Sequence, residues 1–300
     1  MATIVANPIR QIDLMSAKQS PQTRSADSAL ALPAGELAVC VRAYYWHDLR
    51  PCGELTLEQR LSYIPPSPYN ALVWLLDGRA LLVECDGKSL ACELPAVFLA
   101  GAHRHAYRSM AITPYSSFGL VFQPGALALL SGMDAAHQVD SISDAWPQLP
   151  PDWQALLSAV AEAPDHARRI ALCEQFLAPR WAAVAGKHRG WVELIGDAWR
   201  HRARVAALGV LNWTQRHFQR RTRQLTGLKP GEVERMLRLE RALLDVRDGR
   251  ASRVDAAAAH GYADQPHFTR EVRALYRRSS GELMQGLNEP DADGDWLLRL

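Results

Sequence analysis

Hydrophobic and polar positions follow two different periods along the chain. Between residues 36 and 124, short apolar runs alternate with turn signals such as Asp77-Gly78 and Asp86-Gly87, and this pattern is typical of strands. From residue 152 onward the apolar positions recur every three to four residues, as they do on helices. The pattern therefore predicts an α+β fold, with a β-rich N-terminal domain and an all-α C-terminal domain.

The β-rich region contains seven predicted strands, and helices follow the last of them. Seven short strands in about ninety residues are typical of a small sandwich or barrel. We expect strands at 37–46, 60–64, 71–76, 80–84, 97–100, 107–112 and 118–122, and accessory helices at 126–130, 152–163 and 165–187.

Near the C-terminus, one helix has clear signals at both ends. Thr214 is a good N-cap and Gly227 is a good residue to follow a helix. Between them, Phe218, Thr222 and Leu225 repeat at helical spacing and predict a buried face. The other face carries three guanidinium groups and one amide, from Arg216, Gln219, Arg220 and Arg223.

The same pattern returns fifty residues later. Asp264 takes the place of the cap Thr214, and the positions that follow keep the same chemistry. The matching residues of this second copy are His267, Phe268, Arg270, Arg273 and Leu275. Because spacing and chemistry repeat together, we interpret the two segments as copies of one helical unit.

The residues around both copies resemble the AraC/XylS family of bacterial transcription regulators. The first copy, residues 211–221, is followed by Gly227-Leu228-Lys229-Pro230, and the second, residues 256–271, contains the specific run Gly-Tyr-x-Asp-x-x-His-Phe-x-Arg. The resemblance covers roughly residues 190 to 285. It implies a domain of two helix-turn-helix units that binds double-stranded DNA.

The resemblance also implies roles for the residues on the two helices. The positions that match the base-reading face are Arg216, Gln219, Arg220, Gln265, His267 and Arg270, and those expected at phosphates are Thr214, Arg223, Thr269 and Arg273. Arg pairs well with guanine and Gln with adenine in the major groove. Alternatively, Arg220 and Arg270 form intramolecular salt bridges.

Some positions depart from the family pattern. Thr222 and Val272 stand where the family usually has Phe, and Asn212 stands where it has Gly. Arg277 and Ser280 replace the usual Gly and Pro after the second helix.

The N-terminal half is similar to the cupin-like sensor half of such regulators, although its motifs are weaker. The resemblance implies a small-molecule effector, a homodimer formed through the helices after the β-domain, and RNA polymerase as a further partner of an activator. Those helices could equally serve only to cover the sheet. We expect an apolar ligand pocket lined by aromatic side chains with polar groups at its mouth, from Tyr44, Trp46, Trp74, Phe98, His103 and Arg104. The alternative is a filled core.

Charge separates the chain into regions. Residues 1–185 carry a net charge of −4, residues 186–287 of +9 and residues 288–300 of −3, within the total of +2. A basic charge confined to one domain is typical of a nucleic-acid-binding surface. We therefore divide the chain into a mobile arm at 1–34, a sensor domain at 35–185, a DNA-binding domain at 190–287 and an acidic tail.

Other classes of function have little support in the sequence. The five cysteines, an odd number without a C-x-x-C pair, argue against disulfides and thiolate zinc sites. No apolar run is long enough to cross a bilayer, so we expect a cytoplasmic protein. No catalytic motif is present, and we expect no enzyme activity and no cofactor. His103 and His105 resemble the His-x-His of metal-binding cupins, but no matching Glu follows. The alternative function is a cupin-type metalloenzyme fused to a DNA-binding module.

Overall fold

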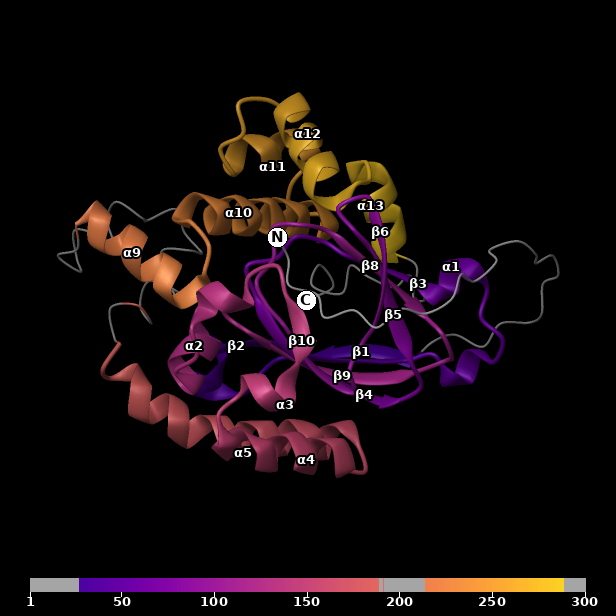
Figure 1. Ribbon diagram of the computed structural model, residues 1–300. Coiled ribbons are helices and arrows are strands. Elements are labelled where there is room, and N and C mark those ends of the chain that lie inside the picture. The colour runs from indigo at the N-terminus through magenta and orange to yellow at the C-terminus, as the bar shows by residue number, and fades with distance from the viewer. Residues whose placement is uncertain (1–26, 189–190, 192–213, 289–300) are drawn as a thin grey trace.

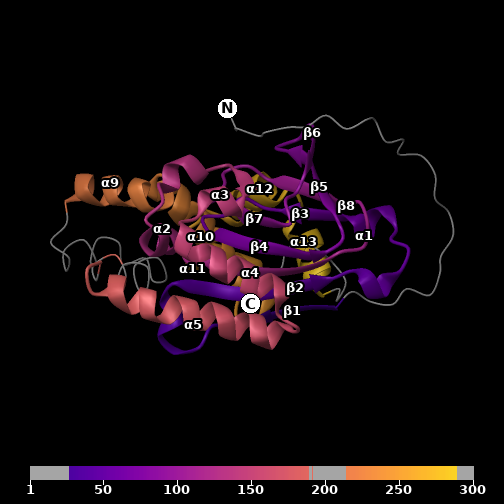
Figure 2. The ribbon, with the colours of Figure 1, turned by 60° about the horizontal axis from the view of Figure 1, so that its bottom comes forward.

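The computed structural model describes residues 27–188, 191 and 214–288. They form a β-rich N-terminal domain and a helical C-terminal region, so the predicted α+β class is confirmed. Figure 1 shows the helices α4 and α5 on one side of the β-domain and α10 to α13 on the opposite side. Figure 2 shows the same arrangement with α4 and α5 in front.

Two antiparallel sheets form the β-domain. The first has the order β1-β2-β9-β4-β7-β10 and the second the order β3-β8-β5-β6. The strands of the first sheet are β1 (Asp27–Ala31), β2 (Val41–Asp48), β9 (Ser116–Phe122), β4 (Asn70–Asp77), β7 (Val97–Ala100) and β10 (Ile142–Asp144). Those of the second are β3 (Leu61–Ile64), β8 (Tyr107–Ala111), β5 (Ala80–Cys85) and β6 (Lys88–Glu93).

Helices surround the sheets and build the C-terminal region. The helices of the N-terminal part are α1 (Leu57–Arg60), α2 (Ala126–Ser131), α3 (Ala145–Gln148), α4 (Gln154–Glu162) and α5 (His166–Ala185), with 3₁₀ turns η1 (Gly35–Val39), η2 (Arg50–Cys52), η3 (Ala135–Gln138) and η4 (Pro151–Trp153). The C-terminal helices are α9 (Gln215–Thr226), α10 (Pro230–Arg247), α11 (Arg253–Ala259), α12 (Gln265–Tyr276) and α13 (Ser280–Asn288).

The structure corrects several sequence predictions. Residues 27–31, assigned to the mobile arm, form strand β1, which pairs along its length with β2. Residues 35–39 form a 3₁₀ turn rather than the beginning of a strand. Strands β6 and β10 were not predicted, because edge strands are held by backbone pairing and need few apolar side chains.

The hydrophobic core is not divided at the predicted domain boundary. One cluster joins the outer face of the six-stranded sheet and helices α2, α4 and α5 to Phe218 and Leu225 of α9 and to Val233 of α10. A separate cluster lies within α10 to α13, around Phe268 and Val272. The first helical unit therefore shares its core with the β-domain, whereas the second has its own.

The five cysteines differ in burial. All five are free thiols; Cys40 and Cys173 are buried and the other three half-buried. Burial raises the pKa of the Cys40 thiol to about 12, so it remains protonated. Within the described residues, no helix is both long and apolar enough to cross a bilayer.

Candidate DNA-binding surface and ligand cavity

Helix α9 begins and ends at the predicted residues. The Thr214 hydroxyl accepts a hydrogen bond from the His217 backbone N–H at 3.2 Å, which caps the helix. Gly227 follows with φ 73°, and its N–H donates to the carbonyl oxygen of Arg223 at 2.8 Å. Phe218, Thr222 and Leu225 are buried, as the spacing predicts.

The basic face of α9 points to solvent. Its exposed side chains are Arg216, Gln219, Arg220 and Arg223. The Arg220 guanidinium lies 3.5 Å from His217 Nδ1. In the described part of the chain, neither Arg220 nor its counterpart Arg270 forms an ion pair with a carboxylate, so the predicted alternative of helix-holding salt bridges has no support there.

Helix α12 has the same length as α9, and its first and last residues lie fifty positions after those of α9. The Asp264 carboxylate accepts from the His267 backbone N–H at 2.6 Å, in the place of Thr214. Phe268, Val272 and Leu275 are buried. The side chains of Gln265, Arg270 and Arg273 are exposed, and those of His267 and Thr269 are half-buried. Each helix thus presents a polar face of the same geometry.

A buried carboxylate joins α12 to the connecting helix α10. Glu271 is 6% exposed and accepts hydrogen bonds from Arg235 at 3.1 Å and from Arg238 at 3.0 Å. Arg238 also lies over the Tyr262 ring, 4.6 Å from its centroid, and burial raises the pKa of the Tyr262 phenol to about 12. These contacts fix the exposed face of α12 relative to α10.

A second buried carboxylate joins α10 to the β-domain. Glu240 is 7% exposed and accepts from Arg42 of β2 at 2.8 Å and from the Tyr69 hydroxyl at 2.6 Å. Burial, and then the neighbouring Glu240 charge, raise the pKa of Tyr69, so the phenol keeps its proton and donates it. No signal in the sequence indicates this joint, because Tyr69 and Arg42 lie 171 and 198 residues before Glu240 in the chain.

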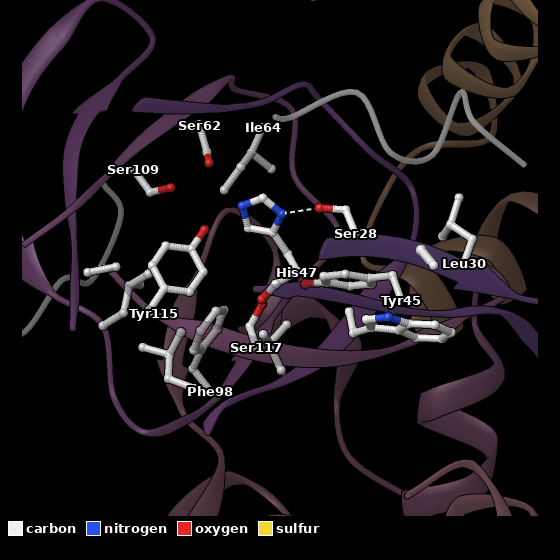
Figure 3. A pocket seen from close by; sticks show the side chains of 16 residues that line it. Ser28, Leu30, Tyr45, His47, Ser62, Ile64, Phe98, Ser109, Tyr115 and Ser117 are labelled. Carbon is white, nitrogen blue, oxygen red and sulfur yellow. Dashed lines mark hydrogen bonds between the residues drawn. The ribbon is translucent and has the colours of Figure 1, made fainter. Parts of the chain in front are cut away.

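The β-domain contains a cavity of about 370 Å³ between its two sheets, which we call the inter-sheet cavity. Figure 3 shows the side chains that line it, including His47, Phe98 and Tyr115. The Ser28 hydroxyl forms a hydrogen bond with His47 Nδ1. Strand β1 provides Ser28, Ala29 and Leu30 to one wall. A volume of this size lies within the range of small-molecule sites.

The structure separates the six residues predicted to form a pocket. Phe98 lines the inter-sheet cavity. Trp46 is also among the residues at its wall, but its ring stacks on His166 of α5, with 4.8 Å between the ring centroids, on the outer face of the sheet. Tyr44 and Trp74 are fully buried on the outer face of the six-stranded sheet, where Trp74 Nε1 donates to the carbonyl oxygen of Leu157 in α4 at 3.0 Å. Neighbouring strand residues point to opposite faces, so Tyr45 of β2 and Val73 of β4 reach the cavity instead.

His103 and Arg104 lie away from this cavity and have structural partners. The two ring nitrogens of His103 lie 2.9 and 2.8 Å from the carbonyl oxygens of Gly101 and Pro65, and burial lowers its pKa. Arg104 Nη2 forms a salt bridge with Asp140 at 2.5 Å. Among the described residues, no group of three His, Cys, Asp or Glu side chains is placed to hold a metal ion.

The comparison that decides the family concerns the C-terminal region. A family model described as a helix-turn-helix domain matches residues 209–286. These residues therefore contain a helix-turn-helix domain of the AraC type. Helices α9 and α12 both lie within the matched residues.

Solved structures of ToxT from Vibrio cholerae match part of this chain at low identity. A 1.65 Å structure is 11% identical and covers 87% of this chain and 98% of ToxT, with a TM-score of 0.43. ToxT bound to an unsaturated fatty acid is 12% identical, with coverages of 75% and 93% and a TM-score of 0.38. ToxT bound to (E)-4-(8-methylnaphthalen-1-yl)but-3-enoic acid is 10% identical, with coverages of 87% and 99% and a TM-score of 0.40. No curated protein matches the chain by sequence.

The AraC-type domain tolerates its departures from the family pattern. Thr222 is fully buried, but its hydroxyl donates to the carbonyl oxygen of Phe218 at 2.9 Å and so is satisfied. Arg277 follows α12 with φ 55° and ψ 15°, the left-handed conformation that Gly227 adopts after α9. Asn212 lies outside the described residues.

Proposed function

We propose that the protein is a transcription regulator that binds duplex DNA through α9 and α12. The repeat carries this proposal: two capped helices of equal length each present exposed Arg and Gln side chains and bury the opposite face. The net charge of +9 within residues 186–287 supports it. We place the DNA-binding domain at 190–287 and the sensor domain at 35–185.

We assign the exposed side chains to two kinds of contact. Base edges in the major groove are contacted by Arg216, Gln219 and Arg220 of α9 and by Gln265, His267 and Arg270 of α12. Phosphates are contacted by Arg223 and Arg273, which lie one turn further along each helix, by Thr214 at the N-cap of α9 and by Thr269 in the second turn of α12. The equivalent exposure of Arg220 and Arg270, and of Arg223 and Arg273, supports the assignment.

Substitutions in the full-length chain test this function. The full chain is required because Phe218 and Leu225 of the first unit pack in a core shared with the β-domain. Arg220→Ala should relax preference at one or two base pairs, worth roughly 1 to 3 kcal/mol of discrimination. Arg223→Ala should weaken binding to all DNA sequences equally. It should also reduce, by about one, the steepness with which the logarithm of the binding constant falls with the logarithm of salt concentration. Arg168→Ala, which removes an exposed Arg from α5, is the control.

Binding-site selection from random duplex DNA, followed by affinity measurements over a range of salt, gives both readouts. Identical specificity profiles for Arg220→Ala and Arg223→Ala would contradict the assignment. A full-length protein that shows no salt-dependent binding to any selected sequence would contradict the function itself.

We also propose that a small molecule regulates this activity through the N-terminal domain. The inter-sheet cavity supports the proposal, since its volume and largely apolar wall are those of a ligand site. A ligand present at one hundred times its dissociation constant adds about 2.7 kcal/mol of stability. A thermal-shift screen of uncharged metabolites checks this, and a screen without any shift would argue for a cavity without a ligand.

The buried side chains of α5 support one of the two roles considered for the accessory helices, which is to cover the sheet. Cys173, Leu177 and Trp181 of α5 are buried in the core beside the six-stranded sheet, so α5 covers that sheet. We retain a homodimer through the outer surface of α4 and α5 as a proposal. Sedimentation of the full-length protein tests it, and a monomer at micromolar concentration in the presence of operator DNA would overturn it.

No observation in the described residues favours the alternative of a metalloenzyme. His103 is engaged by two backbone carbonyls. Asp86 and Asp140 lie at different ring nitrogens of His105, and these three described residues are not placed to hold one metal ion. We therefore propose a regulator without catalytic activity.

A further inference from the structure

The walls of the inter-sheet cavity combine apolar side chains with hydroxyl, phenol and imidazole groups. In the part of the chain that the structure describes, none of the 16 lining residues is Lys, Arg, Asp or Glu. The polar atoms come from serine hydroxyls, tyrosine phenols and the His47 imidazole (Figure 3). Burying an ionised carboxylate or sulfonate without a counter-charge costs several kcal/mol. The cavity is therefore suited to an uncharged ligand that carries hydroxyl or carbonyl groups.

Strand β3 forms part of this wall and also touches helix α12. Ser62 and Ile64 line the cavity, and Tyr63 between them points to the other face of the sheet. The Tyr63 hydroxyl donates a hydrogen bond to the backbone carbonyl oxygen of Leu275 at 2.9 Å. The Arg278 guanidinium lies over the Tyr63 ring, 5.3 Å from its centroid. One strand of four residues thus separates the cavity from α12.

The contact is made at the weakest point of α12. The last four carbonyl groups of a helix have no partner within the helix, and Leu275 is the second-last residue of α12. The next turn depends on Arg277 in the left-handed conformation, which is unfavourable for a residue with a side chain. The Arg277 guanidinium forms a salt bridge with Asp86 in the turn between β5 and β6. The Arg277 N–H donates to the carbonyl oxygen of Arg273 at 3.0 Å, as Gly227 does to Arg223 after α9, and the β-domain adds the contacts of Tyr63 and Asp86 to this end of α12.

We infer that the inter-sheet cavity binds an uncharged, mainly apolar ligand and that β3 transmits its occupancy to α12 through the Tyr63–Leu275 hydrogen bond. The inference rests on the proposed regulatory function. A ligand that packs on Ser62 and Ile64 orders β3, and an ordered β3 holds the Tyr63 hydroxyl on the end of α12. Coupling of this kind requires an element that both sites bias, and β3 is that element.

A pair of matched dyes tests the ligand class in the full-length protein. N-phenyl-1-naphthylamine is uncharged, and 8-anilinonaphthalene-1-sulfonate has the same ring system with an added anionic group. We expect the uncharged dye to bind with increased fluorescence, and the sulfonate to displace it at least about 10-fold less well, because none of the described lining residues is Lys or Arg. Ser117→Leu, which adds apolar bulk to the cavity from β9, should reduce binding of the uncharged dye. Equal displacement by the sulfonate, or binding unchanged in Ser117→Leu, would overturn the assignment of the site.

Hydrogen exchange at the end of α12 tests the route. Saturation with the uncharged dye should slow amide exchange in residues 273–277 by about 2- to 12-fold, the effect expected for one stabilised hydrogen bond. Tyr63→Phe should abolish this response while the dye still binds. Tyr69→Phe is the matched control, since it removes a tyrosine hydroxyl that bonds α10 rather than α12, and it should keep the response.

The outcomes separate the route, the ligand class and the proposed function. The same slowing in Tyr63→Phe as in the native protein, or no slowing with the dye bound, overturns the route. If the uncharged dye does not bind, the ligand class is wrong. The route can then be tested with Ser117→Leu, because the leucine side chain fills part of the cavity. This variant should slow amide exchange at residues 273–277 when Tyr63 is present and not in combination with Tyr63→Phe. Failure of the full-length protein to bind DNA would refute the regulatory function, whatever the exchange shows.

Discussion

The joint around Glu240 allows the sharpest quantitative test of how the two regions are held together. Tyr69→Phe removes one hydroxyl and leaves the ring in place. That hydroxyl donates to Glu240 Oε2 at 2.6 Å, and Tyr69 and Glu240 are 6% and 7% exposed. Water therefore cannot replace the lost donor without rearrangement of the interface.

The expected loss follows from the charge of the acceptor. A hydrogen bond to an ionised group contributes about 1.5 to 3 kcal/mol, more than one between neutral groups. Glu240 keeps its bond with Arg42 at 2.8 Å in the variant, so the carboxylate remains paired. We expect Tyr69→Phe to lower the free energy of unfolding by about 1.5 to 3 kcal/mol. Glu240→Gln should cost more, about 3 to 5 kcal/mol, because it leaves Arg42 without its counter-charge.

Tyr44→Phe is a matched control for this substitution. Tyr44 is fully buried in the same domain, and within the described residues its hydroxyl has no hydrogen-bond partner. Removing an unpaired buried hydroxyl is neutral or stabilising. Equilibrium urea denaturation of the full-length variants measures the differences, with a double-mutant cycle of Tyr69→Phe and Glu240→Gln for the coupling. Equal losses in Tyr69→Phe and Tyr44→Phe, or additive losses in the cycle, would refute the reasoning.

Three further substitutions test local features. Thr214→Ala should lower the free energy of unfolding by about 1 kcal/mol through loss of the α9 cap, whereas Thr214→Asn should restore it in the same urea titration; equal losses would refute the cap. Gly227→Ala should cost more than Gly249→Ala: both have positive φ, but a Cβ at 227 would lie 2.7 Å from a backbone oxygen of η3 and one at 249 meets nothing within 4 Å. Equal melting temperatures would contradict this. Gly119→Ala should weaken binding of the uncharged dye, since its Cβ would lie 1.9 Å from the Tyr45 ring that lines the cavity; an unchanged dissociation constant would show that the ring has room to move.

Local chemistry determined helices α9 and α12, and the sequence was therefore enough to predict them. The caps Thr214 and Asp264 and the buried faces around Phe218 and Phe268 use residues within one or two turns of each other. Capping residues and apolar spacing of this kind predict a helix and its two ends without knowledge of the rest of the chain. Most central strands were predicted for the same reason, since alternation of apolar and polar residues is also local.

Only the tertiary structure decided which strand face meets which neighbour. The spacing of Tyr44 and Trp46 shows that they share a face, but both faces of β2 are covered, one by helices and one by the second sheet. Alternation alone cannot distinguish two buried faces, and the predicted pocket therefore included Tyr44 and Trp74, which pack toward α4 and α5.

The contacts between the β-domain and the DNA-binding helices also depend on tertiary structure. Tyr63 and Leu275 are separated by 212 residues, and Tyr69 and Glu240 by 171. No local rule pairs such residues, because their proximity is set by how the sheets and helices pack. The same packing accounts for Arg277, which has the wrong local chemistry for a left-handed cap and is held there by Asp86 from the other domain.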